Sequence, residues 1–309
     1  MNVLTANDLI SNSAALQAVS PVAKLAVFGD PVAHSKSPAM HNAALQALGV
    51  DASYVAVHVE PHQLESALRA LPARGFLGAN LTIPHKAAAF DIIDEVDESA
   101  RELGVVNTIL VDGDRLRGFN TDGPGLVRAI REQFSVDVKD LRILLFGAGG
   151  GAGRAIALQC AMENCQRLVL VNRTLEKAVA LRDELAPRFH SDRLEGPVDR
   201  LEAIPHEIGP LRQQLDYVDL IINASSLGMK RSDPPILPAS LLTPNLMVFD
   251  TVYASGDSRL LEDARSAGAR AANGLAMLLH QGALSLEIWL NRTAPLTVMR
   301  RALEAAAKS

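Results

Sequence analysis

The chain has 309 residues, of which 48% are hydrophobic and 21% charged, and its formal net charge is −5. Because single hydrophobic cores stop growing at about 250–300 residues, this length predicts two domains. The mildly acidic balance contains no long run of Lys or Arg, which argues against a nucleic acid or a membrane surface as a partner. No uncharged apolar run is long enough to span a bilayer, and residues 1–18 lack the basic start of a signal peptide, so we expect a soluble, cytoplasmic protein.

The first part of the chain alternates strand-like and helix-like segments. Strands are expected at 25–28, 54–59 and 78–83, and helices at 40–48, 63–70, 86–95 and 98–103. The runs 107–111 and 115–119 flank Asp112-Gly113 and predict a hairpin. Such alternation indicates an α/β domain with a mostly parallel sheet covered on both faces.

The second part begins after a predicted helix at 124–133. The expected elements are strands at 141–146, 168–171, 218–222 and 246–249 and helices at 152–162, 175–185, 274–290 and 296–307. This β-α-β-α order is typical of a nucleotide-binding doubly wound fold. We expect 187–210 to be a loop with one weak strand, and residues 1–20 to be a weakly helical extension without an assigned role.

A glycine-rich loop connects the strand at 141–146 to the next helix. It consists of Gly147, Ala148, Gly149, Gly150, Gly151 and Ala152 and reads GxGxxA. Glycines at such a turn let the backbone approach a pyrophosphate, whose charge is met by amide groups at the helix N-terminus. The placement between strand and helix favours a dinucleotide site, and the alternative is an ordinary tight connection.

The segment after the next strand indicates which dinucleotide is bound. An NAD site usually has Asp or Glu there, whereas this chain has Asn172-Arg173-Thr174, with Lys177 one turn later. Cationic and hydroxyl groups suit a 2′-phosphate, so NADP(H) is favoured as cofactor. Thr174 is also a good helix N-cap, but a cap does not explain Arg173.

Polar residues at three strand ends are candidates for the substrate site. Ser35 and Ser37 follow the first strand, although Ser37 and Pro38 also suit a plain helix start. Lys86 lies near a helix start, where a cation is disfavoured, which suggests proton transfer; an exposed lysine is the plainer interpretation. Asp122 suits either an N-cap or a carboxylate paired with Lys86, and spacing alone does not decide between them.

The sequence has no pattern typical of a metal site or of a serine acyl-transfer site. His34 and His41 are not at metal-ligand spacing, and Cys160 and Cys165 fit neither a disulfide framework nor a CxxC motif. The chain has no GxSxG elbow and no P-loop lysine motif. We therefore expect no metal site and no serine acyl transfer.

Together these motifs resemble the shikimate dehydrogenase family of NADP-dependent oxidoreductases. The resemblance runs from about residue 25 to 289 in the family's order and includes FGDPVAHSKSPAMHNAAL (28–45), GFLGANLTIPHK (75–86), GVVNTI (104–109), GFNTDGPG (118–125), the glycine loop, VNRT (171–174), INASSLGM (222–229), FDTVY (249–253) and NGLAMLLHQGA (273–283). It implies that the terminal helices return to the first domain. The expected organisation is an extension at 1–20, a substrate-binding domain at 21–122 plus 274–309, and a Rossmann-type NADP-binding domain at 123–273.

The resemblance also implies roles for individual residues. Lys86 and Asp122 would be the catalytic pair, with Asp122 also contacting substrate. The other implied substrate-binding residues are Ser35, Ser37, Asn80, Thr82, Asn107, Tyr253 and Gln281. The implied cofactor-binding residues are the glycine loop from Gly147 to Ala152, Asn172, Arg173, Thr174, Lys177, Glu98, Thr251 and Gly274.

The implied reaction is the reversible NADPH-dependent reduction of 3-dehydroshikimate to shikimate, a step of chorismate and aromatic amino acid biosynthesis. Three features depart from the family pattern: one extra residue between Gly147 and Arg154, Thr251 in place of methionine, and Ala276 in place of glycine. The alternatives are an enzyme that also accepts quinate, a non-catalytic NADP-binding protein and, more distantly, a folate-linked dehydrogenase. The expected partner is a small molecule, and the expected assembly is a monomer or a homodimer.

Overall fold

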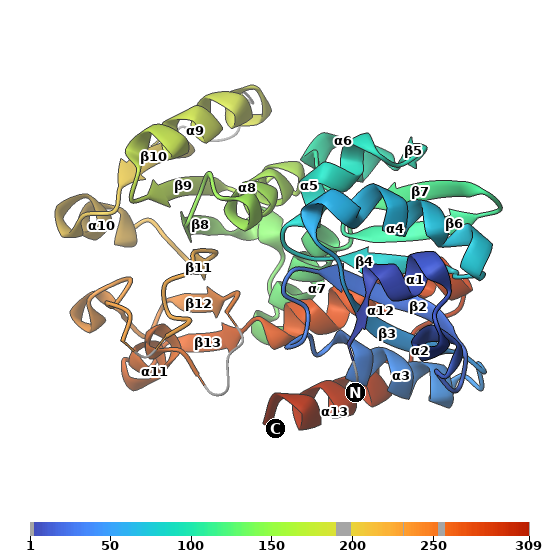
Figure 1. The fold of residues 1–309 in the computed structure, drawn as a ribbon. Helices are drawn as coiled ribbons and strands as arrows, with labels where there is room; N and C mark the ends of the chain where they lie inside the picture. The colour runs from blue at the N-terminus through green and yellow to red at the C-terminus, as the bar shows by residue number, and fades with distance from the viewer. Residues whose placement is uncertain (1–2, 190–198, 231, 253–256, 309) are drawn as a thin grey trace. The chain divides into compact units, whose positions relative to one another are not determined.

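The chain forms two compact units in a computed structural model that describes residues 3–189, 199–230, 232–252 and 257–308. The first unit comprises Met1–Gly125 and Leu278–Ser309, and the second comprises Leu126–Met277. Helices α7 (Asp122–Phe134) and α12 (Leu275–Leu290) carry the chain from one unit to the other (Figure 1). The first unit is therefore discontinuous in sequence.

The first unit is built on a seven-stranded sheet of order β1-β3-β2-β4-β6-β7-β5. Its strands are β1 (Leu4–Thr5), β2 (Ala23–Gly29), β3 (Ser53–His58), β4 (Gly78–Leu81), β5 (Glu95–Val96), β6 (Thr108–Asp112) and β7 (Arg115–Phe119). The strands from β1 to β4 are parallel, and β6 and β7 form the predicted antiparallel hairpin. The carboxyl ends of β2, β3 and β4 therefore meet at one edge, where small ligands of open α/β sheets bind.

Helices surround this sheet. They are α1 (Ala6–Ser11), α2 (Ala14–Gln17), α3 (Ser37–Ala47), α4 (Leu64–Ala70), α5 (His85–Ala88), α6 (Glu98–Leu103) and α13 (Leu296–Lys308), together with the first turn of α7 and most of α12. The terminal helix α13 packs against α3, and α1 packs against α4 (Figure 1). Short 3-10 helices occur at Pro61–Gln63, Pro72–Arg74 and Ala89–Asp91 in this unit and at Val138–Asp140 and Ala239–Leu241 in the second.

The N-terminal segment is part of the first unit's core. Thr5 and Asp8 form a capping box at the start of α1, and Leu9 is fully buried. Strand β1 pairs with β3, with Leu4 opposite Val57. Burial of this apolar face gives the segment, which had no role from the sequence alone, a structural one.

The helix predicted at 86–95 is wrong in length. Only His85–Ala88 is α-helical, and the chain then forms a 3-10 turn and the edge strand β5. Asp94 accepts hydrogen bonds from the Leu116 amide at 2.7 Å and from Arg69 at 2.7 Å. These tertiary hydrogen bonds hold Asp94 at the edge of the sheet, so the helix is shorter than its local propensity predicts.

The second unit is built on a six-stranded, all-parallel sheet of order β10-β9-β8-β11-β12-β13. Its strands are β8 (Arg142–Phe146), β9 (Arg167–Asn172), β10 (Leu201–Pro205), β11 (Leu220–Asn223), β12 (Met247–Asp250) and β13 (Arg270–Asn273). Its helices are α8 (Gly151–Met162), α9 (Leu175–Phe189), α10 (Ile208–Leu215) and α11 (Arg259–Ser266), with the rest of α7 and the start of α12. Counted along this unit, the strand order is 3-2-1-4-5-6, that of the dinucleotide-binding Rossmann fold.

Three elements of the second unit were missed from the sequence. Helices α10 and α11 and strand β13 are present, while the weak strand expected within 187–210 is β10. Strand β13 has only four residues, of which Ala272 alone is buried, so its apolar signal is weak. Across the residues described in both units, no helix is long and apolar enough to cross a membrane.

Candidate active site and nucleotide site

Lys86 and Asp122 form an ion pair in the first unit. The Lys86 Nζ lies 2.7 Å from Asp122 Oδ2, and the two side chains are 33% and 17% exposed. Lys86 is the second residue of the short α5, and Asp122 is the first residue of α7. The pair is partly buried yet accessible, as a proton donor with its orienting carboxylate must be.

Asn120 holds the backbone of Asp122 at the start of α7. The Asn120 Oδ1 accepts hydrogen bonds from the amides of Asp122 at 3.0 Å and Gly123 at 3.2 Å. It thereby satisfies the first two amides of α7, which have no acceptor within the helix. Spacing left two roles open for Asp122, an N-cap or a partner of Lys86; in the structure Asp122 is the first residue of α7 and its carboxylate is paired with Lys86.

Ser37 does not cap helix α3. Lys36 is the N-cap residue and makes no capping bond, while the Ser37 amide donates to Ser35 Oγ at 3.3 Å. Ser37 is buried and is the first residue of α3, so a helix does start here, but the N-cap interpretation of Ser37 is wrong. Burial also raises the pKa of Tyr54, on the neighbouring strand β3, well above its usual value.

Buried aromatic rings support this arrangement. The His41 ring stacks on the Tyr54 ring at a centroid distance of 4.3 Å. Burial lowers the pKa of His41 to about 3, so its imidazole is neutral at physiological pH. Trp289 completes the group and donates from Nε1 to the Ile109 carbonyl at 2.8 Å.

Asn80 is engaged entirely within the protein. Its Oδ1 accepts from the Tyr54 hydroxyl at 2.8 Å, and its Nδ2 lies within 2.9–3.1 Å of the Asn107 carbonyl, Thr108 Oγ1 and Ser285 Oγ. The amide oxygen and the amide nitrogen thus both have protein partners. This geometry favours a supporting role over the direct substrate contact that the sequence suggested.

Asn107 and Gln281 contact each other next to Asn80. Asn107 Nδ2 donates to Thr121 Oγ1 at 2.9 Å and to Gln281 Oε1 at 3.4 Å, and its Oδ1 accepts from the Thr121 amide at 2.8 Å. The side-chain amide of Gln281 also donates to the Leu278 carbonyl at 2.8 Å. The structure therefore brings Asn107 and Gln281 together, while Tyr253 lies outside the described residues. Thr82 lies just beyond β4, three residues before the start of α5.

The glycine loop of the second unit follows β8. Gly147 and Gly149 have φ angles of +80° and +87°, and a Cβ on Gly147 would lie 2.7 Å from the Ser225 amide nitrogen. Helix α8 begins at Gly151, with Gly150 as its N-cap residue. The first amides of this twelve-residue helix have no partner within the helix, so the loop forms a suitable cradle for a pyrophosphate.

Gly153 is the third glycine of the dinucleotide-binding fingerprint, where the helix packs closely on the strand. A Cβ at Gly153 would collide with the Gly147 carbonyl oxygen, whereas one at Gly151 would meet nothing within 4 Å. The close helix–strand approach of the fingerprint is therefore at Gly153, and the loop reads GxGxxxG. Placing the third position at Ala152 was wrong by one residue, which accounts for the extra residue before Arg154.

The residues predicted to select NADP lie after β9. Asn172 Nδ2 donates to the Ala148 carbonyl, and its Oδ1 accepts from the Thr174 amide at 2.9 Å. Arg173, Thr174 and Lys177 are exposed. Asn172 thus links the glycine loop to the start of α9 and leaves the Arg173 side chain in solvent, available to a phosphate.

The remaining predicted cofactor residues are divided between the units. Thr251 follows β12 and donates its amide to the Asn223 carbonyl at 3.0 Å, and Gly274 follows β13. Both lie in the second unit, whereas Glu98 begins α6 in the first.

Asp250 forms a buried network beside Thr251. Its Oδ1 accepts from Asn223 Nδ2 at 2.8 Å and from the Val252 amide at 3.0 Å, and its Oδ2 accepts from Ser258 Oγ at 2.5 Å. The residue is fully buried, and this burial raises the pKa of its carboxyl group despite these bonds. The network joins the ends of β11 and β12 to Ser258, the N-cap residue of α11.

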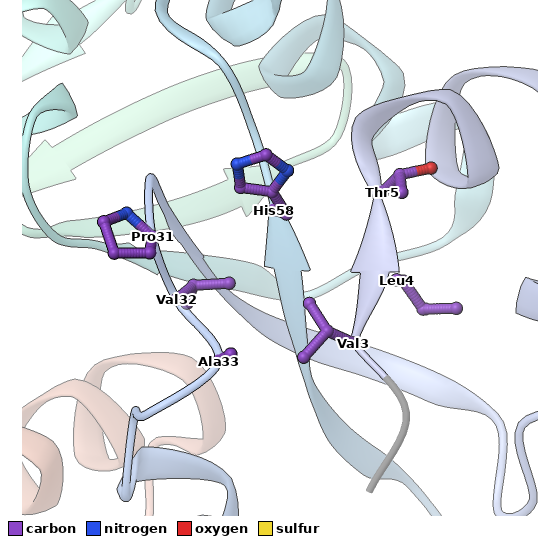
Figure 2. A pocket seen from close by; sticks show the side chains of 7 residues that line it. All are labelled: Val3, Leu4, Thr5, Pro31, Val32, Ala33 and His58. Carbon is purple, nitrogen blue, oxygen red and sulfur yellow. The ribbon is translucent and has the colours of Figure 1, made fainter.

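A separate cavity of about 300 Å³ lies in the first unit. It is lined by Val3, Leu4, Thr5, Pro31, Val32, Ala33 and His58, none of which is a predicted site residue (Figure 2). His58 is paired with Asp30 at 2.9 Å. Among the described residues, no cluster of three or more His, Cys, Asp or Glu residues could hold a metal ion.

Comparison with known proteins relates the chain to one family. Residues 27–109 match the model described as the shikimate dehydrogenase substrate binding domain, and residues 274–304 match the shikimate 5′-dehydrogenase C-terminal domain. A shikimate dehydrogenase (NADP+) from Symbiobacterium thermophilum is 43% identical over 284 residues, which cover 91% of this chain and 94% of the relative. The chain belongs to the shikimate dehydrogenase family.

Solved structures of similar proteins share the fold. The shikimate 5-dehydrogenase of Thermus thermophilus, in complex with NADP(H) and shikimate, has a TM-score of 0.79 and 34% identity and covers 92% of this chain and 100% of its own. A quinate dehydrogenase from Corynebacterium glutamicum, in complex with NAD, has a TM-score of 0.76 and 27% identity and covers 91% and 98%. The two-domain architecture with a Rossmann-type nucleotide-binding unit is therefore confirmed.

Proposed function

We propose that this protein is an NADP-dependent shikimate dehydrogenase that interconverts 3-dehydroshikimate and shikimate. The observation that carries the proposal is the Lys86–Asp122 pair at 2.7 Å, because it joins two segments predicted to be catalytic. Family membership at about 40% identity to relatives named shikimate dehydrogenase (NADP+) supports the same reaction. The exposed Arg173 supports NADP as the cofactor.

The chemistry needs a hydride and a proton. When bound, NADPH supplies the hydride to the C3 carbonyl carbon of 3-dehydroshikimate. The Lys86 ammonium stabilises the negative charge that develops on the C3 oxygen and delivers the proton to it. Asp122 holds Lys86 in place, and in the oxidation of shikimate the same lysine accepts the proton.

Substrate binding is assigned to polar groups, most of which lie in the first unit. Ser35 and Ser37 present hydroxyls for the substrate carboxylate, and Asn107, Gln281 and Thr82 present polar groups for the ring hydroxyls. Tyr253 has the same role by resemblance. These groups orient the substrate carbonyl toward the nicotinamide, so the reacting atoms are already aligned when the substrate is bound.

The nucleotide site is assigned to the second unit. The loop from Gly147 to Gly153 holds the pyrophosphate, and Arg173 with Thr174 and Lys177 holds the 2′-phosphate. Asn172 keeps these two segments together through its bonds to Ala148 and Thr174. Glu98, Thr251 and Gly274 stay predictions as cofactor contacts.

Quinate is the alternative substrate, because a quinate dehydrogenase shares the fold at 27% identity. Quinate carries an additional hydroxyl at C1 beside the carboxylate and needs more room there. The Ser35 and Ser37 pair favours shikimate, and the Asn172-Arg173-Thr174 segment favours NADP over NAD.

The test is the absorbance at 340 nm with purified protein and each pairing of shikimate or quinate with NADP or NAD. We expect fast NADPH formation with shikimate and NADP, and much slower reactions with the other pairs. Comparable rates with quinate would establish dual specificity. No turnover of either substrate, in protein that binds NADP, would overturn the enzymatic assignment. The cytoplasmic location and the monomeric or homodimeric state stay predictions, for which size-exclusion chromatography with light scattering measures the assembly.

A further inference from the structure

A cluster of three buried hydroxyl groups lies behind the proposed substrate site. It consists of Thr108, Thr121 and Ser285, whose relative exposures are 0%, 3% and 0%. Their oxygens are within 2.8–3.2 Å of one another. They come from β6, from the segment before α7 and from α12, so the cluster joins three elements that are distant in sequence.

The Ser285 hydroxyl both donates and accepts hydrogen bonds. Its hydroxyl donates to the Gln281 carbonyl at 2.9 Å, which leaves its two lone pairs as acceptors. One accepts from Asn80 Nδ2 at 2.9 Å, and the other accepts from one of the two threonines. The remaining threonine proton goes to Asn107 Oδ1, so every hydroxyl proton has an acceptor.

This geometry links Ser285 to Gln281 in two ways. The two residues are one helical turn apart on α12, so they share a face, and the Ser285 hydroxyl bonds directly to the Gln281 backbone. Gln281 itself touches Asn107 only at 3.4 Å, the long limit of a hydrogen bond. The bonds of Ser285 to Asn80 and Thr108, at 2.9 and 2.8 Å, are shorter and determine how this part of α12 meets the sheet.

We propose that Ser285 is a positioning residue that sets the affinity for substrate by holding Gln281 and the Asn80–Asn107 amides in place. Its hydroxyl is fully buried and acts through these neighbours. The inference rests on the proposed function, because it assigns Ser285 to the substrate side of that reaction. It predicts a change in substrate affinity with little change in the chemical step.

The experiment compares the steady-state kinetics of the wild type with Ser285→Ala, Ser285→Thr and Leu286→Val. We expect Ser285→Ala to raise the KM for shikimate about tenfold, with kcat and the KM for NADP near wild-type values, because displaced amides of Gln281 and Asn107 would lose the equivalent of one hydrogen bond to substrate. Ser285→Thr keeps the hydroxyl and should restore most of the affinity. Leu286 is fully buried on the same helix, so Leu286→Val controls for loosened packing and should leave the KM unchanged.

The fluorescence of Trp289, the single tryptophan, reports whether α12 stays packed on β6 in each variant. A wild-type KM in Ser285→Ala overturns the proposal, and so does an equal rise in Ser285→Ala and Leu286→Val. If the wild type fails to oxidise shikimate, the proposed function fails instead. Equal rates for the wild type and Ser285→Ala at low shikimate contradict only the role of Ser285.

Discussion

The ion pair of Lys86 and Asp122 is the central contact of the proposed catalytic site. Asn120 accepts from the amides of Asp122 and Gly123, and the Asp122 carboxylate lies 2.7 Å from the Lys86 ammonium. The Lys86 side chain is one-third exposed, which leaves it open to a ligand.

Replacing Lys86 should affect turnover far more than binding. We expect Lys86→Ala to lower kcat by about 10²–10⁴-fold, the usual contribution of a general acid, with a much smaller change in the KM for shikimate. Stopped-flow and steady-state assays at 340 nm measure both. Lys139→Ala, which removes an exposed lysine of the second unit, is the control. Near-normal turnover in Lys86→Ala would remove this lysine from the mechanism.

Asp250 makes stability depend on pH. Its pKa in the folded protein is raised above 3.8, chiefly by burial, so the folded state favours the protonated carboxyl group. That contribution to stability is fully present below the unfolded-state pKa and is lost as the pH rises through the folded-state pKa. Asp250→Asn removes this titration and can keep the Oδ1 bonds to Asn223 and Val252.

We therefore expect the free energy of unfolding of Asp250→Asn, relative to the wild type, to rise as the pH increases above the ordinary carboxyl pKa of 3.8. Urea denaturation at a series of pH values measures this difference. A difference that stays constant with pH would show that Asp250 does not titrate in this range.

At the scale of elements, the glycine loop shows how close packing selects a residue type. Gly147 needs a positive φ and a close approach to Ser225, and Gly153 lies where a Cβ would meet the Gly147 carbonyl oxygen. The N-terminus of α8 can therefore lie directly against the end of β8. The pyrophosphate site depends on this contact between a helix and a strand.

Gly153→Ala should disturb the nucleotide site. The added methyl forces α8 away from β8, so we expect a loss of about 1–3 kcal/mol in the free energy of unfolding and a higher KM for NADP. The KM for shikimate should change less. Gly209→Ala places a methyl group in open space on α10 and serves as the matched control. Equal NADP affinity in Gly153→Ala and the wild type would contradict the loop register described above.

At the scale of the whole molecule, the substrate site and the nucleotide site are predicted on different units. The predicted catalytic pair and most predicted substrate residues lie in the first unit, and the glycine loop and Arg173 lie in the second. Each unit has its own buried core, so each ligand is expected to stabilise chiefly the unit that holds it.

Hydrogen exchange with mass spectrometry tests this division. At about 100 times its Kd, NADP should stabilise the folded protein by about 2.7 kcal/mol and protect amides at 147–153 and 172–177. Shikimate should protect amides near Ser35, Lys86 and Asn107. Protection by NADP confined to the first unit would contradict the assignment of the nucleotide site.

The sequence alone determined the features that depend on local pattern. The strand–glycine–helix order predicted the nucleotide-binding fold, and Asp112-Gly113 between two strand-like runs predicted the hairpin of β6 and β7, because turn chemistry and periodicity act over a few residues. Short or half-buried elements such as β13 and α10 were missed, since they bury little apolar surface and leave a weak pattern. Ser285 had one usable signal, a hydroxyl one turn from Gln281 in an apolar helix.

Only the tertiary structure decided which residues pair through ion pairs, hydrogen bonds and close packing. Whether Asp122 caps a helix or pairs with Lys86, whether Gly153 or Ala152 packs against the strand, and whether Asn80 faces substrate or the protein all depend on residues far apart in the chain. Hydrogen bonds and close packing act over about 3–4 Å in space, and no spacing along the sequence encodes those distances. The residue types that the chemistry requires were therefore readable from the sequence, while their pairing followed from the packing of β4, β6, α7 and α12.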